Sequence, residues 1–227
     1  MLILTTYFGH TGRFERFLAP WLQSVRPYGT PVLITDQPRE HALVCSTNGW
    51  EDCLRAEHPF DIKGALLCDA LNRIPPDEDA FLVDLDATIL RDPRPMLKRF
   101  AGVPIAMTMD SGAILYGNAP FFTGAWSAIP KRNSGIIWFG ASPDRVRIGL
   151  EYRKGWHELL DGGLPWRPLL PHLLEQHAWT MANHRLGAAT LPAVLNWSSR
   201  FLGSSPEVLI DHDFGWGKWG SDVPKNM

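Results

Sequence analysis

Apolar residues recur along the chain in two ways, as short runs between turn residues and as positions three or four residues apart. The first pattern predicts strands and the second predicts amphipathic helices. We expect strands over residues 2–7, 31–35, 80–84, 103–107, 134–139 and 208–210. We expect helices over residues 12–26, 62–73, 93–100, 142–157 and 173–184. Strands that alternate with helices predict an α/β fold with a mostly parallel sheet flanked by helices.

Local signals refine this expectation in some places and are weak in others. The first two strands and the helix between them have the length of a βαβ unit, so we expect them to pair in parallel. Thr11 and Asp61 precede the first two helices and are expected to cap them. Residues 36–60 give no clear element, and residues 108–132 contain many Gly and Pro and predict a loop over a site.

Composition limits the class of protein. The length fits a single domain over residues 1–227, and a net charge of −2 argues against a nucleic-acid partner. No apolar run approaches the roughly 20 residues of a membrane span, and residues 1–7 predict a first strand, not a signal peptide. The three cysteines lack metal-ligand spacing and predict free thiols in a reducing compartment. We therefore expect a cytoplasmic protein, with recruitment to a membrane surface left open.

The most informative motif is a pair of aspartates at the end of a predicted buried strand. Residues 81–90 read Phe-Leu-Val-Asp-Leu-Asp-Ala-Thr-Ile-Leu, with Asp84 and Asp86 two positions apart. Side chains two positions apart along a strand share a face, so both carboxylates can address one ligand. Close carboxylates repel each other unless a cation or a shared proton joins them. The pair therefore predicts a hard divalent metal at a strand end, where α/β sheets bind ligands.

Two classes of enzyme use such a pair. Residues 84–88, Asp-Leu-Asp-Ala-Thr, resemble the first motif of haloacid-dehalogenase-like phosphatases, in which the first aspartate, here Asp84, is a nucleophile. The later acids Asp211 and Asp213 leave that alternative open. The same pair resembles the motif of GT-A nucleotide-sugar glycosyltransferases, in which the carboxylates hold a metal against the donor diphosphate.

Four later elements favour the glycosyltransferase because they follow one another in that family's order. They are Arg-Asn-Ser-Gly-Ile-Ile-Trp-Phe at 132–139, Glu-Gln at 175–176, Leu-Pro at 191–192 with Asn-Trp at 196–197, and His-Asp-Phe-Gly-Trp-Gly-Lys-Trp at 212–219. Residues 2 to 219 thus resemble the retaining GT-A glycosyltransferases typified by glycogenin and bacterial lipopolysaccharide galactosyltransferases. The chain departs from that pattern at Trp219, where the family has proline, and at Glu175, where it has aspartate.

The resemblance implies GT-A architecture, a Rossmann-like nucleotide-diphospho-sugar transferase, whose tail from about residue 211 completes the metal and diphosphate site. Asp84, Asp86 and His212 would hold Mn²⁺ or Mg²⁺, and mixed carboxylate and imidazole ligands fit Mn²⁺ somewhat better. Gly215 would let the backbone approach the diphosphate, and Lys218 would neutralise charge on it.

The resemblance also assigns residues to the donor. Thr6 and Tyr7 match the position that holds the nucleobase, with uracil favoured. Lys63 would bind a phosphate, and Asn133 would bind the donor sugar. Each residue also has a structural interpretation, as a packed strand-end aromatic for Tyr7, a solvated helix residue for Lys63 and a cap or turn residue for Asn133.

Two neighbouring residues are candidates for the reacting centre. Gln176 matches the polar residue on the reacting face of the sugar, with Glu175 as the second candidate. Retention of configuration lets the leaving phosphate take the proton, so Gln176 would orient the reactants. Inversion would instead need a carboxylate base, for which Glu175 or Asp110 is available.

These residues together predict transfer of a hexose from a nucleoside-diphosphate sugar, with a UDP-sugar favoured, to a hydroxyl acceptor. The acceptor could be a glycan, a lipid-linked sugar or a protein. A noncatalytic nucleotide-sugar-binding protein is the alternative beside the phosphatase.

Overall fold

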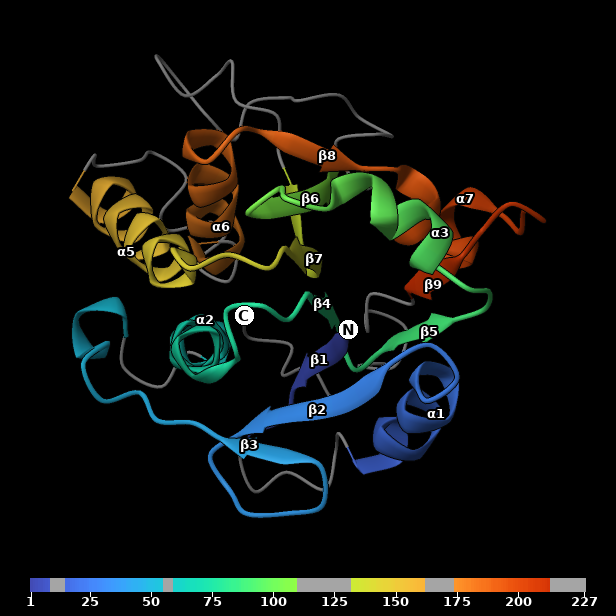
Figure 1. Ribbon diagram of the computed structural model, residues 1–227, viewed down its shortest axis with the longest axis horizontal. Helices are drawn as coiled ribbons and strands as arrows, with labels where there is room; N and C mark the ends of the chain where they lie inside the picture. The colour runs from blue at the N-terminus through green and yellow to red at the C-terminus, as the bar shows by residue number, and fades with distance from the viewer. Residues whose placement is uncertain (9–14, 55–58, 110–131, 162–173, 213–227) are drawn as a thin grey trace, which may run out of the picture.

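The computed structural model describes residues 1–8, 15–54, 59–109, 132–161 and 174–212. Its centre is a seven-stranded sheet in the order β3-β2-β1-β4-β7-β6-β8 (Figure 1). The strands are β1 (Leu2–Thr6), β2 (Thr30–Thr35), β3 (Ala42–Val44), β4 (Ala80–Val83), β6 (Ile105–Met109), β7 (Arg132–Phe139) and β8 (Ala189–Leu191). Neighbouring strands are parallel except where β7 meets β4 and β6. The predicted α/β fold with a mostly parallel sheet is confirmed.

A second, antiparallel pair of strands lies beside this sheet. It consists of β5 (Ala87–Ile89) and β9 (Ile210–His212). The sequence predicts β9 two residues early and misses β3, β5 and β8. Each of the missed strands has three residues, which is too short to show the alternation that identifies a strand.

Helices cover both faces of the sheet (Figure 1). They are α1 (Glu15–Val25), α2 (Pro59–Arg73), α3 (Arg94–Leu97), α5 (Arg145–Asp161), α6 (Leu174–Arg185) and α7 (Ser199–Leu202), with short 3₁₀ turns at Glu51–Cys53, Lys98–Phe100 and Ala193–Leu195. The predicted cap Asp61 is wrong, because α2 begins at Pro59 and Asp61 lies inside its first turn. Thr11 lies outside the described residues.

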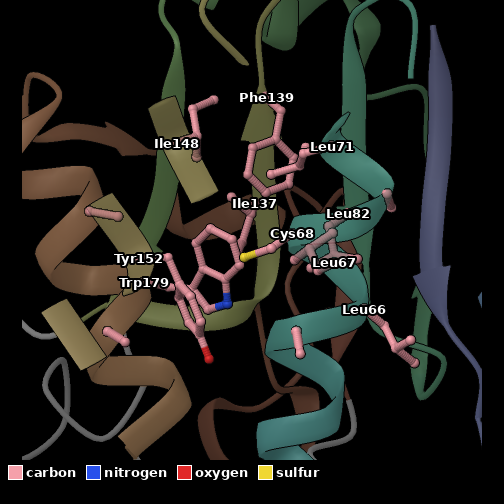
Figure 2. Close-up of a cluster of buried hydrophobic side chains, with 14 of the residues drawn as sticks. Leu66, Leu67, Cys68, Leu71, Leu82, Ile137, Phe139, Ile148, Tyr152 and Trp179 are labelled. Atoms are coloured by element: carbon pink, nitrogen blue, oxygen red, sulfur yellow. The ribbon is translucent and has the colours of Figure 1, made fainter. Parts of the chain in front are cut away.

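Successive residues of the central strands enter two separate hydrophobic clusters. Leu82, Ile137 and Phe139 pack with α2, α5 and α6, as Figure 2 shows. Phe81 and Val83 point to the opposite face and pack with α1. Both faces of the sheet are therefore buried, which explains why β4 and the second half of β7, residues 136–139, are continuous apolar runs without alternation.

The order of the strands places a switch point between β1 and β4. From β1 the chain builds outward through β2 and β3, and it then returns to place β4 on the other side of β1. Because β1 and β4 are parallel, their C-terminal ends lie at the same edge of the sheet. Tyr7 and Asp84 directly follow these ends, where open α/β sheets form a crevice for ligands.

The structure also bears on two expectations from composition, which concern membrane spans and cysteines. The described part of the chain contains no helix that is long and apolar enough to cross a membrane. Cys45, Cys53 and Cys68 are buried free thiols, as predicted. Burial raises the pKa of the Cys45 and Cys53 thiols to about 12, so both stay protonated at neutral pH.

Candidate active site

The two aspartates lie in a turn that joins β4 to β5. The N–H of Ala87 donates to the carbonyl of Asp84 at 2.9 Å, and the N–H of Asp84 donates to the carbonyl of Gly135 on β7 at 2.8 Å. Since β4 ends at Val83, the carboxylates converge because of this turn. The predicted cause, alternation along a strand, is wrong.

His212 reaches the aspartates through strand pairing. Because β9 pairs with β5, His212 lies opposite Ala87, the residue that follows Asp86. Its Nε2 lies 3.1 Å from Oδ1 of Asp86 and 3.8 Å from Oδ2 of Asp84. Donor atoms of Asp84, Asp86 and His212 all lie within 4.8 Å of one another, a spacing that one metal ion could bridge.

Electrostatics within this triad favour an ion pair when no metal is bound. Burial alone would raise the pKa of Asp86, but the attraction of His212 outweighs it and the pKa lies below its usual value. Burial alone would lower the pKa of His212, but Asp86 and Asp84 raise it above its usual value. A metal would take the place of the proton on Nε2, since a histidine ligand must be neutral.

Lys63 projects from α2 into the same group of residues. Its Nζ lies 2.8 Å from Oδ1 of Asp84 and 3.3 Å from the carbonyl oxygen of Ser134. Burial alone would lower the pKa of Lys63, but the attraction of Asp84 and Glu175 raises it above its usual value. The side chain is buried, so the solvated-helix interpretation is wrong. A phosphate contact for Lys63 stays a prediction, and the contact that the structure describes is with Asp84.

Gly135 provides the space in which two members of the triad meet. A Cβ at this position would lie 2.4 Å from Cε1 of His212 and 2.6 Å from Oδ2 of Asp84, closer than carbon and oxygen atoms can approach. Sequence reasoning did not assign a role to Gly135. The available signal was its place in the Asn-Ser-Gly element at the start of β7.

Glu175 lies behind the site, at the start of α6. The hydroxyl of Ser134 donates to Oε2 of Glu175 at 2.8 Å, and the side chain is 1% exposed. Burial raises the pKa of Glu175 to about 7, although Lys63 partly offsets this effect. Gln176 follows it in α6 and is also buried. At neutral pH, Glu175 is therefore divided between its acid and its carboxylate.

The raised pKa of Glu175 predicts a pH-dependent stability. Between about 4.5, the ordinary value, and about 7, the native state binds a proton that the unfolded state has released, so the free energy of unfolding falls as pH rises. Glu175→Gln should remove this dependence, which amounts to about 3 kcal/mol across the window. Urea unfolding in EDTA at pH 5 and pH 8 measures it, with exposed Glu207→Gln as the control. Equal pH dependence in wild type and Glu175→Gln would contradict the prediction.

Tyr7 lies in a cluster of polar side chains beyond β1. Its hydroxyl donates to the carboxylate of Glu15, and the guanidinium of Arg39 lies 4.3 Å from the centroid of its ring. Arg39 also donates to Glu15 at 3.1 Å. One face of the ring is therefore covered by a cation, so a stacked uracil would use the other face or displace Arg39. Thr6 is the last residue of β1 and pairs with Ile34.

The remaining predicted residues divide into one described residue and several that lie outside the described part of the chain. Oδ1 of Asn133 accepts a hydrogen bond from the N–H of Gly135 at 2.8 Å, which is the turn role that the sequence left open. A sugar contact for Asn133 stays a prediction. Gly215, Lys218, Asp110 and Asp213 lie outside the described residues, and so does most of the predicted loop at 108–132.

Comparison with known proteins identifies the fold. No protein-family model matches the chain, and no curated protein sequence is similar to it. The solved structure of galactosyltransferase LgtC in complex with donor and acceptor sugar analogs matches 93% of this chain and 86% of its own, with a TM-score of 0.61 and 10% identity. An active-site mutant of LgtC matches over the same shares with a TM-score of 0.56 and 9% identity. The fold is therefore the GT-A type. LgtC is one solved protein that displays it.

Proposed function

We propose that this protein is a metal-dependent glycosyltransferase that moves a hexose from a nucleoside-diphosphate sugar, with UDP favoured, to a hydroxyl acceptor with retention of configuration. The observation that carries the proposal is the convergence of Asp84, Asp86 and His212 at the switch point of a GT-A fold. LgtC was solved with donor and acceptor sugar analogs, which supports the same substrate class here.

The donor atoms of the triad fit a divalent metal. Two carboxylates and one imidazole suit Mn²⁺ and also accept Mg²⁺. The hydrogen bond between Nδ1 of His212 and Oδ1 of Asn196, at 2.8 Å, leaves Nε2 as the nitrogen that faces the aspartates. When bound, the metal would supply positive charge next to the departing diphosphate.

The surrounding side chains have separate tasks in this proposal. Lys63 balances the charge of Asp84, and Lys218 would meet the leaving diphosphate. Gln176 orients the sugar and the acceptor hydroxyl, and it has no basic group that could remove a proton. In LgtC a glutamine of the active site was the one mutated to glutamate, which supports a glutamine in this role. A retaining reaction is consistent with it, since the leaving phosphate can accept the proton of the acceptor.

The rest of the donor site and the acceptor belong to the same proposal. Thr6 and Tyr7 would hold the nucleobase, Asn133 would contact the sugar, and Gly215 would let the backbone approach the diphosphate. The acceptor is a glycan, a lipid-linked sugar or a protein. The protein works in the cytoplasm, where a membrane surface could present a lipid-linked acceptor.

A nucleotide-dependent thermal shift tests the proposal directly. With UDP at about 100 times its Kd, binding adds about 2.7 kcal/mol, which corresponds to a rise in Tm of roughly 5–10 °C for a chain of this size. We expect this rise with UDP and Mn²⁺ together and little rise with UDP in EDTA; GDP and ADP serve as comparisons. No shift with any nucleoside diphosphate would overturn the proposal. A shift that needs no metal would overturn metal dependence alone.

The phosphatase alternative predicts a different result. It would need Asp211 and Asp213 as a later acidic pair, but the carboxylate of Asp211 accepts two hydrogen bonds from Ser199, at 2.9 and 2.6 Å, at the start of α7. A phosphatase would release phosphate from simple esters without a nucleotide. A noncatalytic binding protein would show the thermal shift but would neither hydrolyse nor transfer the sugar.

A further inference from the structure

A buried chain of hydrogen bonds leads from the central sheet to His212. Nδ1 of His212 and Oδ1 of Asn196 are 2.8 Å apart, and Nδ2 of Asn196 donates to Oγ1 of Thr108 at 2.9 Å. Thr108 belongs to β6, and Asn196 follows the 3₁₀ turn at Ala193–Leu195. Thr108, Asn196 and His212 are each at most 3% exposed, so water cannot readily replace these bonds.

The chemistry of the amide determines what the ring can do. A carbonyl oxygen only accepts, so Nδ1 of His212 must carry the proton that it donates to Asn196. A neutral ring with its proton on Nδ1 has its lone pair on Nε2, the nitrogen that lies near Asp86 and Asp84. This tautomer is the one that can bind a metal through Nε2.

The backbone next to Asn196 also holds the strand that carries His212. The N–H of Trp197 donates to the carbonyl of Ile210 at 3.1 Å, and the N–H of His212 donates to the carbonyl of Trp197 at 2.6 Å. The segment Asn196–Trp197 therefore fixes both the main chain and the ring of His212. Gly135 also limits where the ring can lie, because a Cβ at that position would come within 2.4 Å of Cε1 of His212.

We propose that Asn196, supported by Thr108, is a positioning residue that selects the tautomer and the orientation of His212 for metal binding. This inference rests on the proposed function, since it assumes a metal at the triad. A histidine that binds a metal through one ring nitrogen typically binds it 10–100-fold more tightly when a second residue holds the other ring nitrogen. We expect a gain of that size from Asn196.

Two substitutions at position 196 test whether Asn196 acts as a hydrogen-bond acceptor or only fills space. Asn196→Ala removes the acceptor and should weaken Mn²⁺ binding by about 10–100-fold. In Asn196→Asp the new carboxylate accepts the hydrogen bond from Nδ1 of His212, and the hydroxyl of Thr108 can turn to donate to that carboxylate. The Mn²⁺ Kd of this variant should therefore stay within a few-fold of wild type. Asn183→Ala removes another buried amide, on α6, and should leave the Kd unchanged.

The measurement is a titration of Mn²⁺ followed by the EPR signal of the free ion, without nucleotide or acceptor. If Asn196→Ala does not fold, Thr108→Val replaces it in the test. Thr108→Val keeps Asn196 and His212 and should weaken Mn²⁺ binding by a few-fold. Wild-type affinity in Asn196→Ala, or in Thr108→Val as its substitute, would overturn the inference. Equal weakening in Asn196→Ala and Asn196→Asp would also overturn it, because the amide would then act as a donor. If the wild-type protein binds no Mn²⁺, both this inference and the proposed metal dependence are overturned. If the wild type and Asn196→Ala bind Mn²⁺ equally tightly, only this inference is overturned.

Discussion

Asp86→Ala is expected to lower Mn²⁺-dependent turnover of a UDP-sugar by about 10³-fold or more while the protein stays folded. Asp86 supplies one of the three donor atoms of the triad. A Lewis-acidic metal lowers the barrier of a reaction in which charge develops by several kcal/mol. Each 1.4 kcal/mol, roughly, changes the rate tenfold. The fold should tolerate the change, because without Asp86 the His212 imidazole can lose its proton. No unpaired charge is then left buried. Release of UDP, with and without added Mn²⁺, measures the effect.

The matched control for Asp86→Ala is Asp211→Ala. Asp211 lies next to His212 on β9 but accepts two hydrogen bonds from Ser199, so its loss removes bonds that are each worth about 1 kcal/mol and should leave turnover within a few-fold. Normal turnover in Asp86→Ala would refute the proposed metal site. A loss in Asp211→Ala as large as in Asp86→Ala, together with release of phosphate from simple esters, would favour the phosphatase.

The central strands could be predicted because burial leaves a strong local pattern. Residues 80–83 and 134–139 are nearly continuous apolar runs, and both lie in the middle of the sheet with both faces covered. The direction of β7 could not be predicted, because antiparallel pairing with β4 and β6 depends on how the chain returns to the sheet. The three-residue strand β5 also escaped prediction, although it is the strand that brings His212 to Asp86.

The site was predictable to the extent that its residues occur in motifs. Asp84, Asp86 and His212 were grouped by the order of motifs along the chain, and pairing of β5 with β9 supplies the physical reason that they meet. The contact between Lys63 and Asp84 was not predictable, because it depends on how α2 packs against the end of β4. The hydrogen bond that His212 donates to Asn196 depends in the same way on packing between segments.

Lys63→Met is expected to have opposite effects on two properties of the protein. Methionine keeps most of the volume of the side chain, so the main change is the loss of a positive charge 2.8 Å from Asp84. Breaking a buried ion pair by removing one partner costs about 3–5 kcal/mol, and the lower end applies because Asp84 is 22% exposed. The same loss makes the triad more negative, so Mn²⁺ should bind at least about tenfold more tightly. Added Mn²⁺ should then restore most of the lost stability.

Urea unfolding with EDTA and with Mn²⁺, combined with an EPR titration, measures both effects of Lys63→Met. Arg73→Met on the same helix is the matched control, because Arg73 pairs with Asp69 at 2.9 Å but is 47% exposed, and such pairs contribute at most about 1 kcal/mol. Unchanged or weaker Mn²⁺ binding in Lys63→Met would show that Lys63 does not set the charge of the triad. A separate titration of UDP at saturating Mn²⁺ tests the predicted phosphate contact, and weaker UDP binding in Lys63→Met supports it. Unchanged UDP binding would leave Lys63 only as the partner of Asp84. In that role Lys63 lowers metal affinity and stabilises the metal-free protein.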